Sequence, residues 1–371
     1  MNFSLLYRVP ALLALCFVLS ACDSSSSQDI DSDPDTNPNE PSLTRQACEF
    51  PQKEIVSGGP GKDGIPALSD PLTVSVDDID YMEDDDRVIA LMIGDRPVAV
   101  PHNILWWHEI ANFNASQKRL AATYCPLTGS SIVFDRRNIG EAELGVSGLL
   151  YQNNLIMYDR NETEALWSQI LTGASCESDK GVPLETVHHV EMNWAGWKAL
   201  YPNAEVISSE TGFSRNYTRY PYGDYEQITN GDLLFPMRPL DTSRPPKERA
   251  LGIPDKDGSA LVFPFGLLDE TGPMRVVSAS FNGRQIIVLW DGEKQAAAAY
   301  EPTTTGGNAV DMQVESGKFI DRITGDIYEV NGRVMTGDNA GISLNPVAEA
   351  YVAFWFAWPA FHPDTQIFSS N

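Results

Sequence analysis

The stretch from Asp95 to Phe134 reads DRPVAVPHNILWWHEIANFNASQKRLAATYCPLTGSSIVF. It holds two of the five histidines, His102 and His108, two adjacent tryptophans, and Cys125 on a Pro-Gly turn. Thiol and imidazole are the side chains most often used for nucleophilic or metal chemistry. A chemical centre, if the chain has one, is therefore expected here.

The same stretch predicts a helix and a hairpin. Asn103 to Asn112 is the best helix candidate in the first half of the chain. The runs Arg119–Tyr124 and Ser130–Phe134 flank a turn and predict a β-hairpin, with Cys125–Gly129 as its loop. Further short strands are expected at residues 74–76, 88–92, 145–151, 155–158 and 165–169.

Composition bounds the class of protein. The chain has 371 residues, 42% of them hydrophobic, with 28 Gly and 25 Pro. So many turn-forming residues favour numerous short strands over long helices. The net charge of −25 excludes binding of nucleic acid or anionic lipid through the protein's own field.

A weak internal repeat predicts two related halves. The segment Trp194–Ser208 aligns with Trp355–Ser369, and Asp159-Arg160 aligns with Asp321-Arg322. Upstream, the run that begins at Arg87 loosely matches the run that begins at Arg249. We expect a β-rich α+β fold, with two tandem halves of short strands and a few helices packed as one unit. The predicted bounds are 48–240 for the half with the candidate site and 241–371 for a mainly structural half.

The N-terminus predicts export and lipidation. Arg8 precedes a short apolar run, and Leu-Ser-Ala-Cys22 has the form of a bacterial lipobox, so residues 1–21 are expected to be a signal peptide. Diacylation of Cys22 with chains such as palmitate would anchor the protein to a lipid bilayer. Residues 22–47, rich in Ser, Asp, Asn and Pro, are expected to form a disordered tether. The predicted location is the cell envelope, facing the periplasm or the outside.

Three cysteines remain for the folded part. The exported compartment is oxidising, so one disulfide and one free thiol are expected. Cys48 and Cys176 both lie in polar, loop-like surroundings, and their pairing is the economical arrangement. It would leave Cys125 as the free thiol.

Three interpretations of the central residues stay open. His102, His108 and Cys125 could bind copper or another transition metal, because thiolate and imidazole suit such ions. Alternatively, Cys125 could be the nucleophile of a thiol hydrolase or transferase, with His108 and Glu109 as its partners. In the third interpretation Cys125 only fills space, and the protein has a structural or interaction role.

Several motifs together resemble the bacterial and archaeal family known as domain of unknown function number 3179. They include Asp63–Leu68, His108-Glu109-Ile110, Thr123–Leu127 with Gly129, Thr211–Tyr217 and Phe354–Trp358. The resemblance spans nearly all of the chain after the tether, and it implies a single fold rather than a particular activity. Family members often have a second Cys where this chain has Thr128, so a metal knuckle built from the pair is lost or altered here.

These observations predict an exported lipoprotein that binds a small ligand or a transition metal near Cys125. A Cys125-dependent enzyme and a protein without chemistry are the alternatives.

Overall fold

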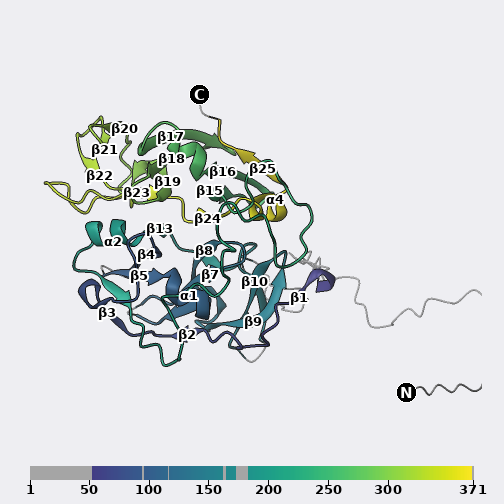
Figure 1. Ribbon diagram of the computed structural model, residues 1–371. Coiled ribbons are helices and arrows are strands. Elements are labelled where there is room, and N and C mark those ends of the chain that lie inside the picture. Colours follow the sequence, from purple (N-terminus) through teal and green to yellow (C-terminus); the bar gives the residue numbers. More distant parts are fainter. Residues whose placement is uncertain (1–51, 94–95, 116, 162–163, 173–182, 370–371) are drawn as a thin grey trace, which may run out of the picture. The chain divides into compact units, whose positions relative to one another are not determined.

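The computed structural model describes residues 52–93, 96–115, 117–161, 164–172 and 183–369 (Figure 1). They belong to one compact unit, Gln46–Asn371. The predicted signal peptide, Cys22, the tether, Cys48 and Cys176 lie outside the described residues. Within the described part, no helix is long and apolar enough to cross a membrane.

The described chain is strand-rich with a few short helices, which confirms the predicted β-rich α+β class. It begins with short elements: the 3-10 helix η1 (Gln52–Glu54), strands β1 (Val56–Ser57), β2 (Leu68–Ser69) and β3 (Thr73–Ser75), and the 3-10 helix η2 (Val76–Asp78).

A first set of elements follows in chain order. It comprises β4 (Arg87–Ile93), β5 (Arg96–Pro101), α1 (His102–His108), β6 (Ile110–Phe113), β7 (Leu120–Cys125), β8 (Ser130–Asp135), η3 (Arg136–Ile139), β9 (Leu144–Tyr151), β10 (Asn154–Asp159), β11 (Leu166–Ser168), β12 (Glu185–Thr186), β13 (Val190–Asn193), α2 (Trp194–Leu200) and β14 (Glu205–Ile207).

A second set then appears in nearly the same order. It comprises β15 (Arg249–Pro254), β16 (Ser259–Pro264), α3 (Phe265–Asp269), β17 (Met274–Phe281), β18 (Arg284–Asp291), β19 (Ala296–Thr304), β20 (Met312–Glu315), β21 (Lys318–Asp321), β22 (Ile327–Tyr328), β23 (Leu344–Pro346), β24 (Tyr351–Phe354), α4 (Ala357–Phe361) and β25 (Asp364–Ile367).

The two sets share their strand pairing. In the first, β13, β4, β5 and β14 lie side by side, with two antiparallel pairs followed by a parallel one. In the second, β24, β15, β16 and β25 repeat that order and those directions. Local hydrogen bonds repeat as well: Trp194 N donates to Asp86 O at 2.7 Å, and Trp355 N donates to Glu248 O at 2.7 Å. The structure therefore contains one motif twice.

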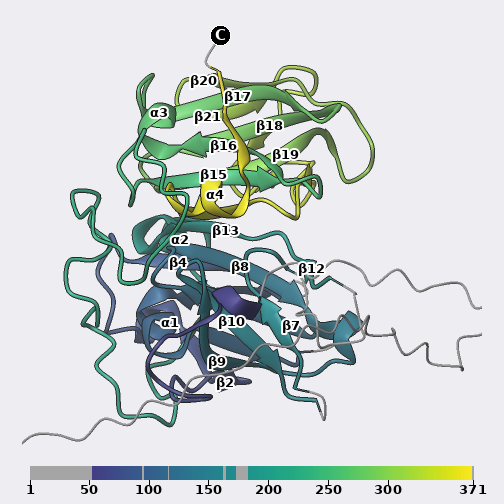
Figure 2. The ribbon, with the colours of Figure 1, turned by 90° about the vertical axis from the view of Figure 1, so that its right-hand side faces the viewer.

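The two copies contact each other, and Figure 2 shows β8 and β13 of the first copy on the side toward the second copy. β8 of the first copy pairs with β24 of the second, with Val352 opposite Ser131. On the other side, Asn193 N at the end of β13 donates to Lys294 O in the β18–β19 turn at 2.9 Å. Residues at these junctions are therefore surrounded by both copies.

The predicted helix at Asn103–Asn112 is too long at its C-terminal end. Helix α1 ends at His108, and Glu109 has φ +57°, which a helix cannot continue. Residues from Ile110 onward form β6 and pair with β7. The apolar run misled the prediction because a buried strand and a buried helix look alike over so few residues.

The predicted hairpin is confirmed as β7 and β8, joined by Pro126–Gly129. Gly129 has φ +59°, and a Cβ there would lie 2.6 Å from the Phe354 ring. Thr128 O accepts from Phe354 N at 2.8 Å. Glycine is thus needed twice over, for the turn and for the close approach of the second copy.

Candidate functional site

Two arginines from corresponding positions meet at one carboxylate. Arg87 is the first residue of β4, and Arg249 is the first residue of β15. Arg87 Nε binds Oε1 of Glu191, and Arg249 Nη1 lies 3.1 Å from the same oxygen. Glu191 stands on β13, where its side chain is fully buried. The position that corresponds to Glu191 on β24 is Val352, so only one copy supplies a carboxylate.

The other oxygen of Glu191 binds polar groups of the first copy. Ser131 Oγ donates to Oε2 at 2.6 Å, and His102 Nε2 lies 3.6 Å from it. Burial would raise the pKa of Glu191, but Arg87, His102 and Arg249 outweigh burial and lower it to about 2. Burial lowers the pKa of His102 to about 3 despite the attraction of Glu191. At neutral pH, Glu191 is therefore ionised and His102 is neutral.

Ser131, His102 and Glu191 do not form a catalytic triad. In a triad, the serine and the carboxylate bind opposite nitrogens of the imidazole. Here Ser131 Oγ, at 3.2 Å, and Glu191 both face Nε2 of His102, and Ser131 donates directly to Glu191. The group is an anchored charge cluster rather than an activated nucleophile.

A cavity of about 300 Å³ lies beside this cluster. Its volume is at the lower end of the roughly 300–1,000 Å³ range of small-molecule sites. The walls come from the segment between the copies, β15, α3, β18 and the β18–β19 turn. They combine charged with aromatic side chains: Glu226, Ile228, Lys247, Glu248, Arg249, Phe265, Gly266, Asp269, Trp290 and Gln295.

The charged wall residues are held in place by neighbours. Glu226 Oε2 lies 3.5 Å from Arg249 Nη2. Burial raises the pKa of Glu226 although Arg249 opposes the shift. Lys247 Nζ donates to Asp232 O at 2.5 Å and lies 3.6 Å from the centre of the Tyr225 ring. Burial lowers the pKa of Lys247 to about 8.

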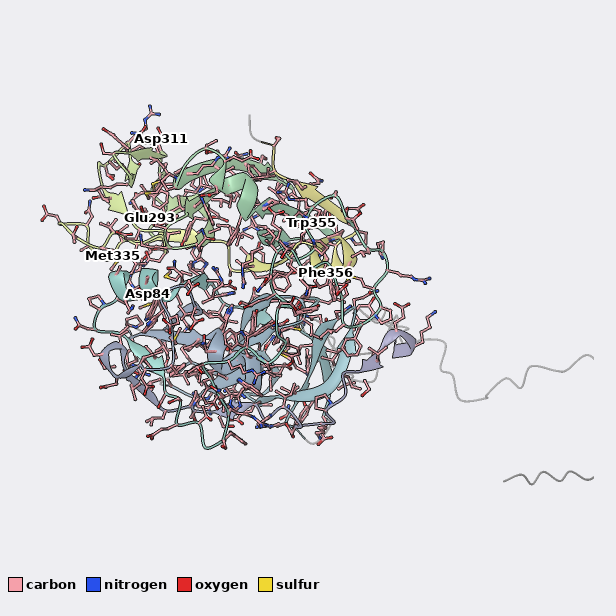
Figure 3. The ribbon with its side chains drawn as sticks, in the orientation of Figure 1. Asp84, Glu293, Asp311, Met335, Trp355 and Phe356 are labelled. Carbon is pink, nitrogen blue, oxygen red and sulfur yellow. The ribbon has the colours of Figure 1, made fainter. Side chains whose placement is uncertain are left out.

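Helix α3 begins at the cavity wall. Glu248 Oε1 accepts from Gly266 N at 3.1 Å and from Arg244 Nη2 at 2.8 Å. Figure 3 shows Trp355 and Phe356 at the end of β24, and their backbone N–H groups bind the segment that carries Glu248. The second copy therefore holds the backbone of this wall by main-chain hydrogen bonds, and Arg244 and Gly266 N hold the Glu248 side chain.

Buried polar atoms without a partner surround the cluster. Trp290 Nε1, on the cavity wall, has no hydrogen-bond partner among the described residues, and neither have the hydroxyls of Tyr124 and Tyr220. The charges of Arg249 and Glu226 act on Tyr124, and that of Glu226 acts on Tyr220. Of these three residues, only Trp290 lines the cavity.

Tyr124 and Trp290 occupy corresponding positions in the two copies. Each is the penultimate residue of its hairpin strand, β7 or β18, and the one aromatic residue in that strand. Each is fully buried. Tyr124 stacks on His102 at 4.0 Å between ring centres, and Trp290 packs on Phe265 at 4.7 Å. His102 and Phe265 are the first residues of α1 and α3. The unpartnered polar atoms thus arise from the same structural position in both copies.

Cys125 is a buried residue at the end of β7. It is 1% exposed, and its Sγ lies 3.6 Å from Asn153 O. Burial and the nearby Glu109 raise the pKa of the Cys125 thiol to about 11, although Thr128 and the Leu127 N–H favour the thiolate. The thiol is therefore protonated and enclosed at neutral pH, which is the opposite of an activated nucleophile.

His108 and Glu109 point to different surroundings. His108 Nδ1 lies 2.7 Å from Pro66 O, and Nε2 lies 2.7 Å from the Tyr217 hydroxyl, so both nitrogens are occupied. Tyr217 in turn contacts Thr211 on the wall of a second cavity of about 330 Å³. Burial alone raises the pKa of Glu109 to about 8.

The structure does not bring the three predicted metal ligands together. His102 joins the Glu191 cluster, His108 joins Tyr217, and Cys125 faces Asn153. Among the described residues, no group of three His, Cys, Asp or Glu side chains could hold a metal ion.

Sequence reasoning found His102 but missed the rest of the cluster. Arg87 and Arg249 were aligned as repeat positions without a role, and Glu191 stood in an unremarkable run, Val-Glu-Met-Asn. The signal available in the sequence was that the first long strand of each copy begins with an arginine, Arg87 or Arg249. Two buried arginines from matching positions require a carboxylate nearby.

The chain belongs to the family described as "Protein of unknown function (DUF3179)", whose model matches residues 62–365. This confirms the resemblance drawn from the motifs. No curated protein and no solved structure matches the chain.

Proposed function

We propose that this chain is an exported lipoprotein whose folded part binds a small polar ligand in the cavity beside Arg249. The observation that supports the proposal is the cavity of about 300 Å³ itself, whose wall combines charged side chains, Arg249 among them, with the aromatic Phe265 and Trp290. Its volume and mixed lining are those of a small-molecule site.

Binding is favoured over catalysis by the state of the side chains. His102 is neutral and enclosed, and Ser131 donates to Glu191 instead of to a base. Cys125 is protonated and enclosed. These side chains are fixed in place and are not activated for proton or group transfer. Such an arrangement suits ligand binding better than catalysis.

Ligand-dependent thermal unfolding tests the binding proposal. The full chain in detergent is heated with separate amino acids, mono- and dicarboxylates, polyols and amines. One chemical class should raise the melting temperature saturably, because a ligand at 100 times its Kd adds about 2.7 kcal/mol to stability. Arg249→Lys should weaken the effect, since lysine lacks the planar fork of arginine.

Arg322→Lys is the matched control, because Arg322 is exposed and pairs with Asp311 at the surface. It should leave the melting shift unchanged. A panel without any saturable shift, or equal shifts in wild type and Arg249→Lys, would overturn the binding proposal.

The lipid anchor is tested separately. Cells expressing the full chain are grown with labelled palmitate, and the label should appear in the wild type and not in Cys22→Ser. Membrane fractionation should follow the label, because two or more acyl chains hold a protein stably at a bilayer. Label retained in Cys22→Ser would mean that another residue carries the acyl chain, and no label in the wild type would mean that the chain is not acylated with palmitate.

A further inference from the structure

We infer that the second cavity, of about 330 Å³, binds a small organic ammonium cation with an apolar body. This site goes beyond the proposed function, because its walls come from residues 67–72 and 210–213 and share no residue with the cavity beside Arg249. The inference stands on two features of the wall. Its polar side chains present hydrogen-bond acceptors, and its opening carries exposed apolar side chains.

Three stretches that carry the family resemblance meet at this cavity. Asp63–Leu68 supplies part of one wall, Thr211–Tyr217 supplies part of another, and His108 contacts Tyr217. These stretches are far apart in the sequence, and none of them contributes to the cluster around Glu191. The second cavity therefore gives them a shared location.

A chain of hydrogen bonds fixes the direction of the Thr211 hydroxyl. His108 Nδ1 lies 2.7 Å from Pro66 O, and because a carbonyl only accepts, Nδ1 carries the proton. Burial lowers the pKa of His108, so at pH 7 the ring is neutral and Nε2 accepts from the Tyr217 hydroxyl at 2.7 Å. The Tyr217 oxygen then accepts from Thr211 Oγ1 at 2.5 Å. Thr211 therefore donates its one proton inside the protein and presents lone pairs to the cavity.

Ser69 is arranged in the same way. Its Oγ donates to Glu143 Oε2 at 2.6 Å, so the Ser69 hydroxyl also has only lone pairs left for a ligand. Main-chain donors of the wall are used as well, because the N–H groups of Asp70, Glu210 and Thr211 bind acceptors within the protein. A ligand that donates hydrogen bonds therefore fits these positions better than one that accepts them.

Two acids give the cavity wall a negative charge. Asp70 accepts from the backbone and side-chain N–H groups of Asn114 at 2.6 and 2.9 Å, and both donors are neutral. Glu210 is exposed, and it forms no ion pair within the described part of the chain. Neither carboxylate is thus neutralised by a cation bonded to it.

Neighbouring cations do not cancel this charge. No described lysine or arginine lines the cavity. Arg136 attracts Asp70 but is shared with Glu141 and Glu143, and Arg215 lies over a tryptophan ring that is not part of the wall. The net charge of −25 adds a field that attracts cations to the protein as a whole.

The opening of the cavity favours an organic cation over a metal ion. Leu72 and Phe213 line it and are 55% and 44% exposed. An ammonium group is attracted to the face of an aromatic ring, and an apolar body covers exposed apolar surface. Among the described residues, no three His, Cys, Asp or Glu side chains are grouped to hold a metal. An ammonium cation with a small apolar body therefore matches both the charge and the shape.

Isosteric probes separate charge from shape. Calorimetric titrations of the full chain in detergent at pH 7 use benzylamine, benzyl alcohol and benzoate, and a branched series of isopentylamine, isopentanol and isovalerate. At least one amine should bind saturably, with its alcohol about tenfold weaker, which corresponds to about 1.4 kcal/mol. The matching carboxylate should show no measurable binding, because the wall repels it.

Two variants locate the amine. Glu210→Gln should weaken amine binding by about three- to fivefold, the range of an exposed ion pair. Tyr217→Phe removes the oxygen that accepts the Thr211 proton, so the Thr211 hydroxyl can turn toward the cavity. The ratio of amine affinity to alcohol affinity should then fall by about threefold, the value of one weak hydrogen bond. Glu315→Gln, at an exposed position of β20 in the second copy, is the matched control and should change nothing.

The outcomes separate this site from the cavity beside Arg249. Equal affinities for amine and alcohol, tighter binding of the carboxylate, or no saturable binding by either amine would overturn the ammonium inference. Amine binding that is lost in Arg249→Lys and kept in Glu210→Gln would overturn it too, because the amine would then lie in the other cavity. In each of these cases the thermal panel with Arg249→Lys still decides the proposed function on its own.

Discussion

Arg87 and Arg249 are equivalent residues of two copies of one motif, and they bind the same oxygen of Glu191. The carboxylate stands on the strand of the first copy that meets the second. The pair therefore links the two copies electrostatically at the place where the cavity opens. Removing the shared partner would take away the carboxylate that Arg87 binds and would leave Arg249 with Glu226 alone.

Glu191→Gln should lower the free energy of unfolding by about 3–5 kcal/mol, the range for breaking a buried ion pair from one side. Urea denaturation at pH 7 measures the loss. Glu205→Gln is the control, because Glu205 pairs with the half-exposed Arg96 at the surface and should cost about 0–1 kcal/mol. Equal losses in the two variants would contradict a central role for the Glu191 cluster.

His102 should make the protein less stable in acid. Burial lowers its pKa from 6.5 to about 3. Between those values the unfolded chain binds a proton on His102 and the folded chain does not, so stability falls as pH falls through this window. The slope from this group is about 1.4 kcal/mol per pH unit.

The measurement for this slope is urea denaturation of wild type and His102→Asn at several pH values from 7 to 4. As the pH falls, the free energy of unfolding should decrease more steeply for the wild type than for His102→Asn, by up to about 1.4 kcal/mol per pH unit. Parallel curves for the two proteins would mean that His102 is protonated in the folded state.

Glu109 should act in the opposite direction. Burial raises its pKa from 4.5 to about 8, so the folded chain keeps a proton that the unfolded chain loses. Glu109 therefore does not change the free energy of unfolding below pH 4.5, and it lowers that free energy as the pH rises from 4.5 toward 8. Glu109→Gln, which imitates the protonated acid, should raise the free energy of unfolding at pH 7 by about 2–3 kcal/mol.

The gain from Glu109→Gln should disappear at pH 4, and that disappearance is its internal control. A loss of stability at pH 7 would show instead that the ionised carboxylate has a stabilising partner in the fold.

Gly129→Ala should cost about 2–4 kcal/mol in thermal or urea unfolding. The new Cβ meets the Phe354 ring at 2.6 Å, in addition to the strain of φ +59°. Gly140→Ala is the matched control, because Gly140 has φ +72° with nothing within 4 Å of the added Cβ. It should cost about 1 kcal/mol. Similar costs would mean that the hairpin loop does not press on β24.

The sequence predicted the parts of the fold that local patterns encode. The β7–β8 hairpin followed from a Pro-Gly turn between two apolar runs. The correspondence of Trp194 with Trp355 followed from aromatic spacing, and both residues begin or precede a helix after the same strand. Such features need only neighbouring residues, and so they are visible in the chain itself.

The site was not predictable in the same way. Glu191 is 104 residues from Arg87 and 58 residues from Arg249 in sequence, and only the pairing of β13 with β4 and the approach of the second copy bring them together. The prediction focused on Cys125 because thiols are rare and reactive, but burial encloses this thiol and raises its pKa to about 11. Burial is a tertiary property, and no residue pattern near Cys125 reveals it.

The most direct test of the binding proposal is a crystal structure of the full chain with the compound that gives the largest Arg249-dependent rise in melting temperature. That compound should occupy the cavity and contact Arg249. An empty cavity at a saturating concentration of the compound, or the compound bound elsewhere on the protein, would contradict the proposal.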